Sequence, residues 1–276
     1  MIVDETGDGN SGAMGTTTLS DALSVVSGKP MLSGHTVILT GAGGGIGNIV
    51  AKMLAAAGAR LAITDLDSGL LTSVAEELRA SGAEVFVNAM DASDRAAFAA
   101  FHAEAESRLG AIDGLVNCAG SWRTGTFASI DEKSWAQTLA ANLGTAVAGC
   151  HTVLPGMIAR RRGSIVNFAS TSGEHGSISP AAHYAAAKGA VIALTKTLAR
   201  EAGPAQVRVN AVSPGPVDTI ALGAATAEQK AAVGSRTLFG RLGLPEEIGG
   251  ACIFLLSPLA SFITGHVLQV NGGSLL

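Results

Sequence analysis

The chain has 276 residues, which is enough for one or two domains with a large buried core. Its 18 Lys and Arg against 22 Asp and Glu give a formal net charge of −4, which argues against nucleic acid or an anionic membrane as the main partner. Hydrophobic residues make up 47% of the chain and aromatic residues only 4%, and 36 glycines indicate closely packed elements joined by tight turns.

The three cysteines, Cys118, Cys150 and Cys252, are widely separated and form no Cys/His cluster with ligand spacing. They are typical of small buried residues in a reducing compartment, and no metal site is expected. Met1–Asn10 carries acidic residues instead of the positive start of a secretory signal. The longest core-like apolar run, Ala251–Leu256, is far shorter than the ~20 residues of a membrane-spanning helix. We therefore expect a cytoplasmic protein with no membrane or nucleic-acid partner.

The first 33 residues are rich in Gly, Ser, Thr and Asp, and 1–33 is predicted to be a flexible N-terminal extension with a brief helical hint at Leu19–Val26. From His35 onward, short apolar runs alternate with longer Ala-rich stretches of helical period, as in repeated βαβ units around a parallel sheet. No linker interrupts 34–276, which is predicted to form one domain.

The predicted strands are His35–Thr40, Arg60–Asp65, Glu84–Asn88, Ile112–Asn117, Ser164–Ala169, Gln206–Val212 and His266–Val270. The predicted helices are Ile46–Ala57, Ser68–Ala80, Ser93–Leu109, Glu132–Arg160, Pro180–Ala202 and Pro245–Leu256. Thr219–Leu244 has only weak helical character and several glycines, and it is predicted to be a mobile flap.

A glycine-rich stretch, Thr40-Gly41-Ala42-Gly43-Gly44-Gly45-Ile46-Gly47, lies between the first predicted strand and the first predicted helix. Glycines there permit a tight turn and let the backbone approach a pyrophosphate, whose charge the N–H groups at the helix start receive. The pattern alone is weak, because it arises by chance ~0.6 times in a chain so rich in glycine. Its position favours a dinucleotide site over a merely tight turn.

Asp65 follows Gly47 by 18 positions and ends the second predicted strand. A carboxylate at that place accepts hydrogen bonds from the adenosine ribose hydroxyls of NAD and repels the 2′-phosphate of NADP. Neither Gly44 nor Leu66 offers a cation for that phosphate. The sequence therefore predicts NAD, and the alternative is a solvated Asp at a strand end.

Tyr184 is the only tyrosine of the chain, and it lies four residues before Lys188. This spacing places both side chains on one face of a helix, where the ammonium would lower the phenol pKa and make the hydroxyl usable as a proton donor or acceptor. The alternative is a core-packed tyrosine beside a solvent-facing lysine.

The motifs resemble those of the short-chain dehydrogenase/reductase family in their order and combination, over roughly residues 33–276. The motifs, in chain order, are Thr40–Gly47, Asn117-Cys118-Ala119-Gly120, Ser170, Tyr184 with Lys188, and Pro214-Gly215-Pro216-Val217-Asp218-Thr219. The resemblance implies a single α/β domain of the Rossmann type, doubly wound, with a seven-stranded parallel sheet flanked by helices. It also implies assembly as a homotetramer or homodimer.

The resemblance implies four catalytic residues. Tyr184 resembles the general acid/base that exchanges a proton with the substrate oxygen, and Lys188 the residue that lowers its pKa and binds the nicotinamide ribose. Ser170 resembles the hydroxyl that bonds the substrate oxygen, and Asn142 the residue that anchors a proton-relay water. The implied cofactor-binding residues are Gly41, Gly45, Ile46, Gly47, Asp65, Asp91 at the adenine, Asn117, Ala119, Gly120, Tyr184, Lys188, Pro214, Gly215, Val217, and Thr219 at the nicotinamide carboxamide.

Two positions depart from the family pattern. Cys118 stands where many members have a second Asn, at a position that mainly shapes a turn. The interval from Ser170 to Tyr184 is one residue longer than is common, which raises Ser172 as an alternative, although the Ser-x-x-Gly spacing to Gly173 favours Ser170.

Several polar residues near these motifs are expected at the rim of the substrate pocket, either solvated or in contact with a polar group of the substrate. They are Trp122, Arg123, Glu174, His175 and His183.

The sequence therefore predicts an NAD-dependent oxidoreductase that transfers a hydride between the nicotinamide and a secondary alcohol or ketone. Two alternatives remain open. One is a 3-oxoacyl-thioester reductase of the fatty-acid type, which the missing cation for NADP disfavours. The other is a sensor that binds the dinucleotide without turnover, which the joint presence of Tyr184, Lys188, Ser170 and Asn142 disfavours.

Overall fold

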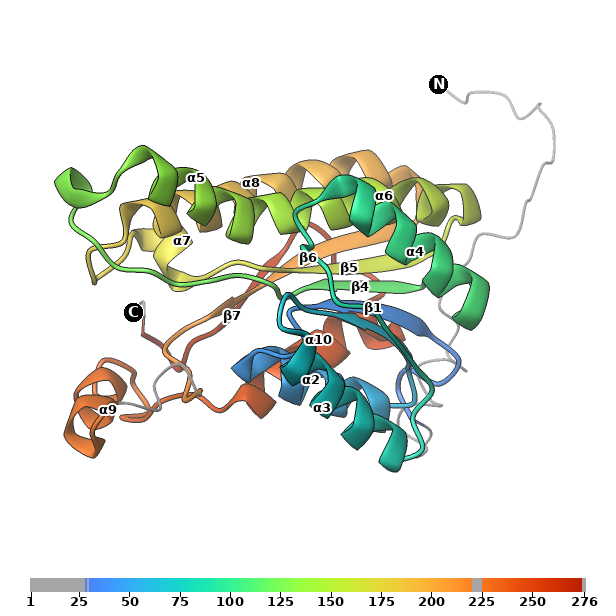
Figure 1. Ribbon diagram of the computed structural model, residues 1–276, viewed down its shortest axis with the longest axis horizontal. Coiled ribbons are helices and arrows are strands. Elements are labelled where there is room, and N and C mark those ends of the chain that lie inside the picture. Colours follow the sequence, from blue (N-terminus) through green and yellow to red (C-terminus); the bar gives the residue numbers. More distant parts are fainter. Residues whose placement is uncertain (1–27, 29, 220–224, 275–276) are drawn as a thin grey trace, which may run out of the picture.

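The computed structural model describes residues 28, 30–219 and 225–274 of the chain, and these form one layered α/β structure (Figure 1). Seven parallel strands make a single sheet in the order β3-β2-β1-β4-β5-β6-β7. The strands are β1 Thr36–Thr40, β2 Arg60–Thr64, β3 Val85–Val87, β4 Gly114–Asn117, β5 Gly163–Phe168, β6 Val207–Pro214 and β7 Val267–Val270. The predicted fold class is confirmed, and β6 runs two residues beyond its predicted end.

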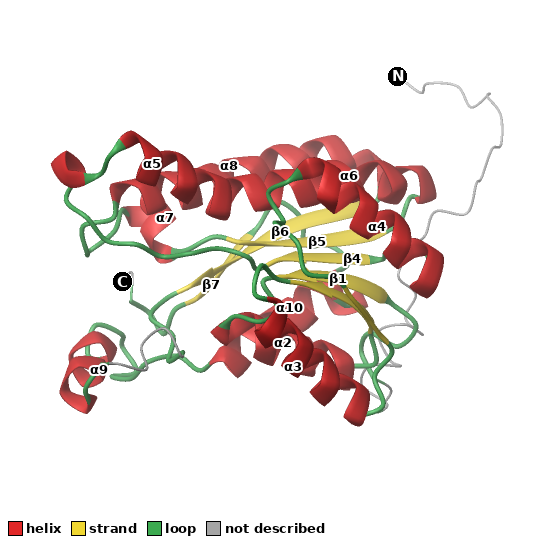
Figure 2. Cartoon of the chain, in the orientation of Figure 1, coloured by secondary structure: helices red, strands yellow, loops and turns green. Residues whose placement is uncertain are grey.

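The helices cover both faces of the sheet, with α2, α3 and α10 on one side and α4, α6 and α8 on the other (Figure 2). They are α2 Gly45–Ala56, α3 Ser68–Ala80, α4 Arg95–Leu109, α5 Glu132–Leu139, α6 Thr145–Arg160, α7 Thr171–His175, α8 Ala182–Ala202, α9 Ala227–Gly234 and α10 Pro245–Leu256. Short 3₁₀ turns lie at Phe127–Ser129, Gly203–Ala205 and Pro258–Ala260. Helices α3 and α10 have their predicted bounds.

The sheet is buried on both faces, as its continuous apolar strands require. In β1, Val37 and Leu39 belong to the core under α2, α3 and α10, while Ile38 belongs to the core under α4, α6 and α8. All three side chains are buried, so the two-residue period of the strand divides its side chains between the two layers.

The predicted single helix over Glu132–Arg160 is wrong, because a π-helical turn at Ala140–Gly144 separates α5 from α6. Inside this turn the Asn142 side-chain amide donates to the carbonyl oxygen of Thr138 at 3.0 Å, so it occupies an acceptor of the preceding turn. Such π-turns are frequent at functional sites, and this one carries a predicted catalytic residue.

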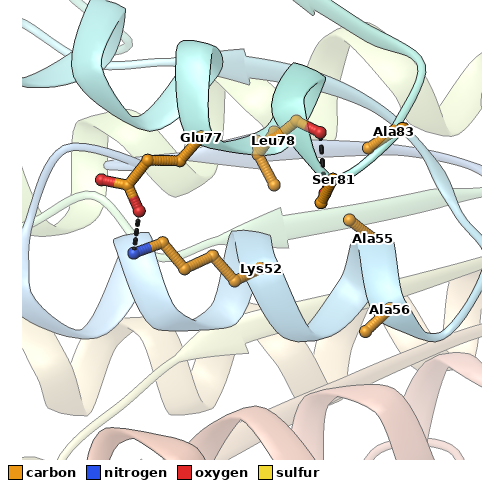
Figure 3. A pocket seen from close by; sticks show the side chains of 8 residues that line it. Lys52, Ala55, Ala56, Glu77, Leu78, Ser81 and Ala83 are labelled. Atoms are coloured by element: carbon orange, nitrogen blue, oxygen red, sulfur yellow. Dashed lines mark hydrogen bonds and ion pairs between the residues drawn. The ribbon is translucent and has the colours of Figure 1, made fainter.

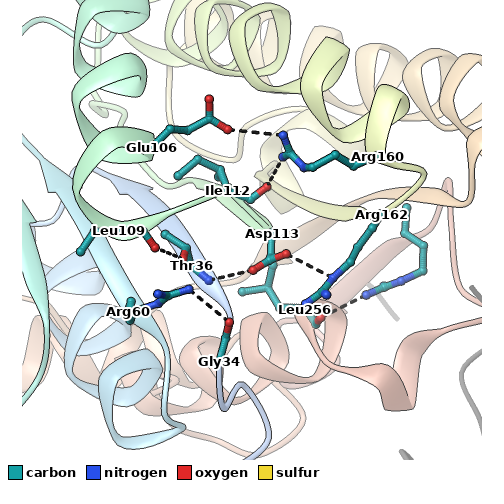
Figure 4. Close-up of polar contacts among 11 residues, drawn as sticks. Gly34, Thr36, Arg60, Glu106, Leu109, Ile112, Asp113, Arg160, Arg162 and Leu256 are labelled. Carbon is teal, nitrogen blue, oxygen red and sulfur yellow. Dashed lines mark hydrogen bonds and ion pairs between the residues drawn. The ribbon is translucent and has the colours of Figure 1, made fainter.

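Charged side chains connect the loops at the amino ends of the strands through hydrogen bonds and ion pairs (Figure 4). Asp113 accepts from the backbone N–H of Thr36 at 3.0 Å and pairs with Arg162 at 3.2 Å. Arg160 donates to the carbonyl oxygen of Ile112 at 3.0 Å. Two residues of the basic run Arg160-Arg161-Arg162 therefore stabilise the fold at the edge opposite the predicted site.

The predicted extension is partly packed onto the domain. Leu32 is fully buried, and its N–H donates to the carbonyl oxygen of Ala57 at 2.8 Å, just before β1. The packed domain therefore includes Leu32, and the flexibility of the extension over 1–33 stays a prediction. Residues 1–27 and 29, with Leu19–Val26 among them, lie outside the described residues.

Candidate active site

The predicted site residues gather where the strand order reverses. From β1 the sheet grows through β2 and β3 in one direction and through β4 to β7 in the other. In such sheets, ligands bind at the carboxyl ends of the strands, where connections diverge to both sides. The glycine loop follows β1, Cys118 to Gly120 follow β4, and Ser170 follows β5.

Tyr184 and Lys188 lie one turn apart on α8 and face the end of β5. The Lys188 ammonium donates to the carbonyl oxygen of Phe168 at 2.7 Å and lies 5.8 Å from the centroid of the Tyr184 ring. Ser170 caps the start of α7, where its Oγ accepts from the N–H of Ser172 at 3.1 Å. The Ser170 hydroxyl also lies close enough to Tyr184 to act on the pKa of its phenol. This contact favours Ser170 over Ser172 as the partner of the phenol.

Burial dominates the electrostatics of both titratable groups. It raises the pKa of Tyr184, while the neighbouring Ser170 hydroxyl opposes this rise. It lowers the pKa of Lys188 to about 8, because an ammonium is disfavoured away from water. In this structure burial outweighs any lowering of the Tyr184 pKa, and the expected lowering by the ammonium stays a prediction.

Asn142 and Lys188 converge on Gly120. A Cβ atom added at Gly120 would lie 2.7 Å from Asn142 Oδ1 and 3.5 Å from Lys188 Nζ. The Asn142 amide nitrogen donates to the carbonyl oxygens of Ser121 and Thr138, whereas its Oδ1 is buried and accepts no hydrogen bond from the described residues. The oxygen therefore offers an acceptor beside the ammonium, as a proton-relay role requires.

The glycine loop is close-packed in a way that only glycine permits at two positions. Gly41 has a φ of 71°, and a Cβ there would lie 2.7 Å from Cα of Ala119. A Cβ at Gly47 would overlap the carbonyl oxygen of Gly41. No described side chain caps the amino end of α2, which begins at Gly45 and continues through Ile46. Free N–H groups at a helix start suit a phosphate, so these residues fit a dinucleotide.

Asp65 lies against this loop, half-buried at the end of β2. Its Oδ2 accepts from the N–H of Gly43 at 2.8 Å, and its Oδ1 from the N–H of Asp67 at 3.1 Å. The carboxylate is therefore held in the glycine loop, where the ribose prediction requires it. Asp91 is exposed, and its Oδ1 accepts from both the N–H and the hydroxyl of Ser93 at 2.8 and 2.7 Å.

Asn117 ends β4, and Ala119 follows it beside the glycine loop. The Asn117 side chain is 3% exposed and donates to Asn167 Oδ1 at 2.8 Å, so it turns into the interior instead of lining a cleft. The N–H of Ala119 donates to the Thr40 hydroxyl at 3.1 Å, which joins the ends of β1 and β4. The structural roles of Thr40 and Asn167 were not predicted, because polar residues inside apolar strands were the only signal.

The segment after β6 lies beside α10 and the C-terminal turn. The N–H of Gly215 donates to the carbonyl oxygen of Val270 at 3.1 Å, next to Pro214, and Val217 pairs with Gly243. Thr219 is half-buried at the end of the described stretch, and residues 220–224 lie outside the described residues.

The predicted flap over Thr219–Leu244 contains helix α9. A capping box of Thr226 and Gln229 starts the helix, and its Lys230 pairs with Asp218 at 2.8 Å. The mobility of this segment stays a prediction.

The five residues expected at the pocket rim have different environments. Trp122, Arg123 and His175 are exposed or half-exposed. His183 is 2% exposed and packs at a tilt against Trp135 with ring centroids 6.2 Å apart, so it does not belong to a solvated rim. Glu174 is half-buried, and its carboxylate accepts hydrogen bonds from Ser213 and Gln269.

A cavity of about 430 Å³ lies between α2 and α3, away from these residues (Figure 3). Its lining includes the Lys52–Glu77 ion pair and small side chains, and it contains none of the predicted site residues. Within the described ranges, His, Cys, Asp and Glu side chains form no cluster suited to a metal ion. No helix in these ranges combines the length and the apolar character that crossing a membrane requires.

Comparisons with known proteins show which family this chain resembles. A family model described as Enoyl-(Acyl carrier protein) reductase matches residues 41–274. The 2-(S)-hydroxypropyl-CoM dehydrogenase 3 of Xanthobacter autotrophicus is 37% identical over 248 residues, which cover 88% of this chain and 97% of that protein. This chain belongs to the short-chain dehydrogenase/reductase family. Members of this family are oxidoreductases that use NAD or NADP.

This chain also matches two further proteins over nearly their whole length. The 3-oxoacyl-(acyl-carrier-protein) reductase FabG of Vibrio cholerae is 36% identical over 242 residues, which cover 88% of this chain and 98% of that protein. A short-chain dehydrogenase/reductase structure from Brucella melitensis, titled glucose/ribitol dehydrogenase, has a TM-score of 0.83 and 36% identity, and the match covers 90% of this chain and 99% of that one. The predicted family and fold are thus confirmed.

Proposed function

We propose that this member of the short-chain dehydrogenase/reductase family uses NAD to interconvert a secondary alcohol and a ketone. The observation that carries the proposal is the convergence of Lys188 and Asn142 on Gly120, with Tyr184 one turn before Lys188 and the Ser170 hydroxyl near the phenol. Two neighbouring hydroxyls can hold one substrate oxygen and exchange one proton with it. The dehydrogenase relative, whose name specifies a hydroxypropyl substrate, supports an alcohol as the substrate class.

The chain's own residues handle the proton and the geometry. The nicotinamide, when bound, supplies the hydride chemistry. Tyr184 gives its phenolic proton to the substrate oxygen in the direction of reduction and takes a proton in the direction of oxidation. Ser170 holds that oxygen by a hydrogen bond, and Asn142 Oδ1 offers an acceptor through which water can return the proton. Lys188 has a pKa of about 8, and at lower pH its ammonium places a positive charge beside the phenol.

The preference for NAD is proposed from Asp65, whose carboxylate is held in the glycine loop by the N–H of Gly43. Because NAD is the proposed cofactor, we expect oxidation of the alcohol to be the cellular direction. Asp65→Asn keeps an oxygen acceptor for Gly43 and removes the charge. The ratio of kcat/KM for NAD to that for NADP should fall at least about fivefold, because even a solvated charge pair a few ångströms apart interacts by about 1 kcal/mol.

The control for this measurement is Glu76→Gln, which removes a charge from an exposed position on α3. It should leave the ratio unchanged. A wild-type protein that prefers NADP, or an Asp65→Asn variant with an unchanged ratio, would contradict the NAD proposal.

The reaction itself is tested by a panel of alcohols and ketones with NAD or NADH, read at the nicotinamide absorbance band. Tyr184→Phe should abolish turnover and leave NADH affinity nearly intact, because only the transferable proton is removed. NADH binding without turnover by the wild type on the whole panel would support a non-catalytic sensor instead.

A 3-oxoacyl-thioester reductase is the second candidate, because the FabG relative matches the chain as well as the dehydrogenase does. The panel therefore includes a 3-oxoacyl thioester, and a kcat/KM highest on that compound would favour the second candidate. The assembly as a homotetramer or homodimer stays a prediction, which light scattering after size exclusion tests.

A further inference from the structure

Helix α7 is too short to hold its own position. It spans only Thr171–His175, and a helix of one turn gains too few hydrogen bonds to offset the cost of ordering its backbone. It begins at Ser170, whose hydroxyl lies near Tyr184 and acts on its pKa. The position of this hydroxyl therefore depends on the contacts that α7 makes with its surroundings.

Close backbone contacts hold α7 against α8. A Cβ added at Gly173 would lie 2.5 Å from the backbone carbon of Lys188 and 2.7 Å from the nitrogen of Gly189, so the two helices touch through their backbones. This close approach sets the distance between the helices. These contacts lie on one side of α7, so its orientation relative to the sheet also depends on the contacts made on its other side.

Glu174 makes such a contact on the sheet side. The Ser213 hydroxyl donates to its Oε1, and the Gln269 amide donates to its Oε2 at 2.7 Å. Ser213 of β6 and Gln269 of β7 are direct partners in the parallel register, so two adjacent strands present two donors together. A carboxylate, with two oxygens in one plane, matches such a pair of donors.

The hydrogen-bond donors that contact the Glu174 carboxylate are neutral groups. In the parts of the chain that the structure describes, no Lys, Arg or His forms an ion pair with Glu174. Its contacts are therefore hydrogen bonds of defined direction, which restrict orientation more than a diffuse charge attraction does.

We propose that Glu174 is a positioning residue that orients α7 and thereby fixes the Ser170 hydroxyl relative to Tyr184 in the proposed alcohol–ketone reaction. Glu174 acts through Ser170 and needs no contact with the substrate. This inference rests on the proposed function, and it assigns a role in catalysis to a residue that the sequence alone placed only at the pocket rim.

The first test compares Glu174→Ala with Glu174→Gln. We expect the Ala variant to lose at least ~10-fold in kcat, because small misplacements of a catalytic group have large effects on rate, with NADH affinity unchanged. Glu174→Gln should restore most of the rate, because the substituted amide keeps an acceptor for Ser213 and can donate to Gln269 once the amide of Gln269 rotates. Gln269→Ala, which removes a single contact, should give an intermediate loss even if Glu174→Ala folds poorly. Glu76→Ala is the matched control on the surface.

A double mutant separates positioning from other roles. In a Ser170→Ala background, Glu174→Ala should cause no further loss of kcat, because its target hydroxyl is already gone. An equal loss in both backgrounds would overturn the proposal, and so would a Glu174→Ala variant that raises KM alone, since that result indicates direct substrate binding. A Glu174→Gln variant as slow as the Ala variant would also overturn it.

A spectroscopic readout keeps this test independent of turnover. Tyr184 is the only tyrosine, so the absorbance of its phenolate reports its titration in the cofactor-free protein. Ser170→Ala and Glu174→Ala should both shift this titration to higher pH, and the two shifts should not add. If the wild type turned over no substrate, the proposed function would fail, whereas this titration would still decide the role of Glu174. An unshifted titration in Glu174→Ala would refute it.

Discussion

The buried ammonium of Lys188 should make the folded protein less stable at neutral pH than a neutral side chain would. Lys188 is 4% exposed, and burial lowers its pKa from 10.5 to about 8. Between these values the unfolded state binds more protons than the folded state, so stability rises with pH. With these two pKa values, the free energy of unfolding gains about 1.3 kcal/mol between pH 7 and pH 9 from this group alone.

Lys188→Met removes the charge and keeps the length of the side chain. Urea unfolding of both proteins at several pH values between 7 and 9, at one protein concentration, should show this gain in the wild type and not in the variant. The cysteines act on stability in the opposite direction. Burial raises the pKa of Cys118 and Cys150 to about 12, so their thiols stay protonated in the folded state and their contribution to the free energy of unfolding falls as the pH rises. These thiols are common to both proteins, so the difference between the two isolates Lys188.

The absolute stability of Lys188→Met is less informative, because the variant also loses the hydrogen bond to Phe168, which offsets part of the gain. Turnover should be lost at the same time. Equal pH slopes in the two proteins would refute the reasoning, because they would show that Lys188 is hydrated in the folded state.

Two further predictions concern the glycine loop and the end of α10. Gly47→Ala should abolish dinucleotide binding in a fluorescence titration, since its Cβ overlaps the Gly41 carbonyl, whereas Gly250→Ala in α10 meets open space and should bind normally. Arg208 donates to the carbonyl oxygens of Leu255, Leu256 and Ser257. Arg208→Met should lower the free energy of unfolding by about 3 kcal/mol in urea, as expected for the loss of several charge-assisted hydrogen bonds, and a loss below about 1 kcal/mol would contradict this role.

Much of the fold follows from local sequence patterns. Continuous apolar runs identified all seven strands because a parallel sheet buries both faces of each strand. Asp67 and Pro245 lie at the starts of α3 and α10, where they suit a helix start, and these helices were predicted to the residue. The π-turn at Asn142 was not predictable from periodicity, because the residues on either side keep a helical pattern and the break depends on one side-chain hydrogen bond.

The sequence indicates which residues come together at the candidate site, but it does not indicate how their side chains point. Sequence order grouped Ser170, Tyr184 and Lys188, and the structure brings them together. Asn117 was expected in the cofactor cleft, but its side chain points into the interior toward Asn167. Spacing along the chain does not encode this direction, because the end of a buried strand has one side facing the core and the other facing the ligand.

The pair of Tyr184 and Lys188 shows the same limit in its chemistry. Their spacing guarantees that the phenol and the ammonium are neighbours, and it suggests that the cation lowers the phenol pKa. Depth of burial acts on each group separately, however, and it favours the neutral form of both. An ammonium that loses its proton near pH 8 supports a phenolate only below that pH. The benefit of Lys188 to Tyr184 is therefore greatest below pH 8, and it fades in the alkaline range where a phenol would ionise most readily unaided.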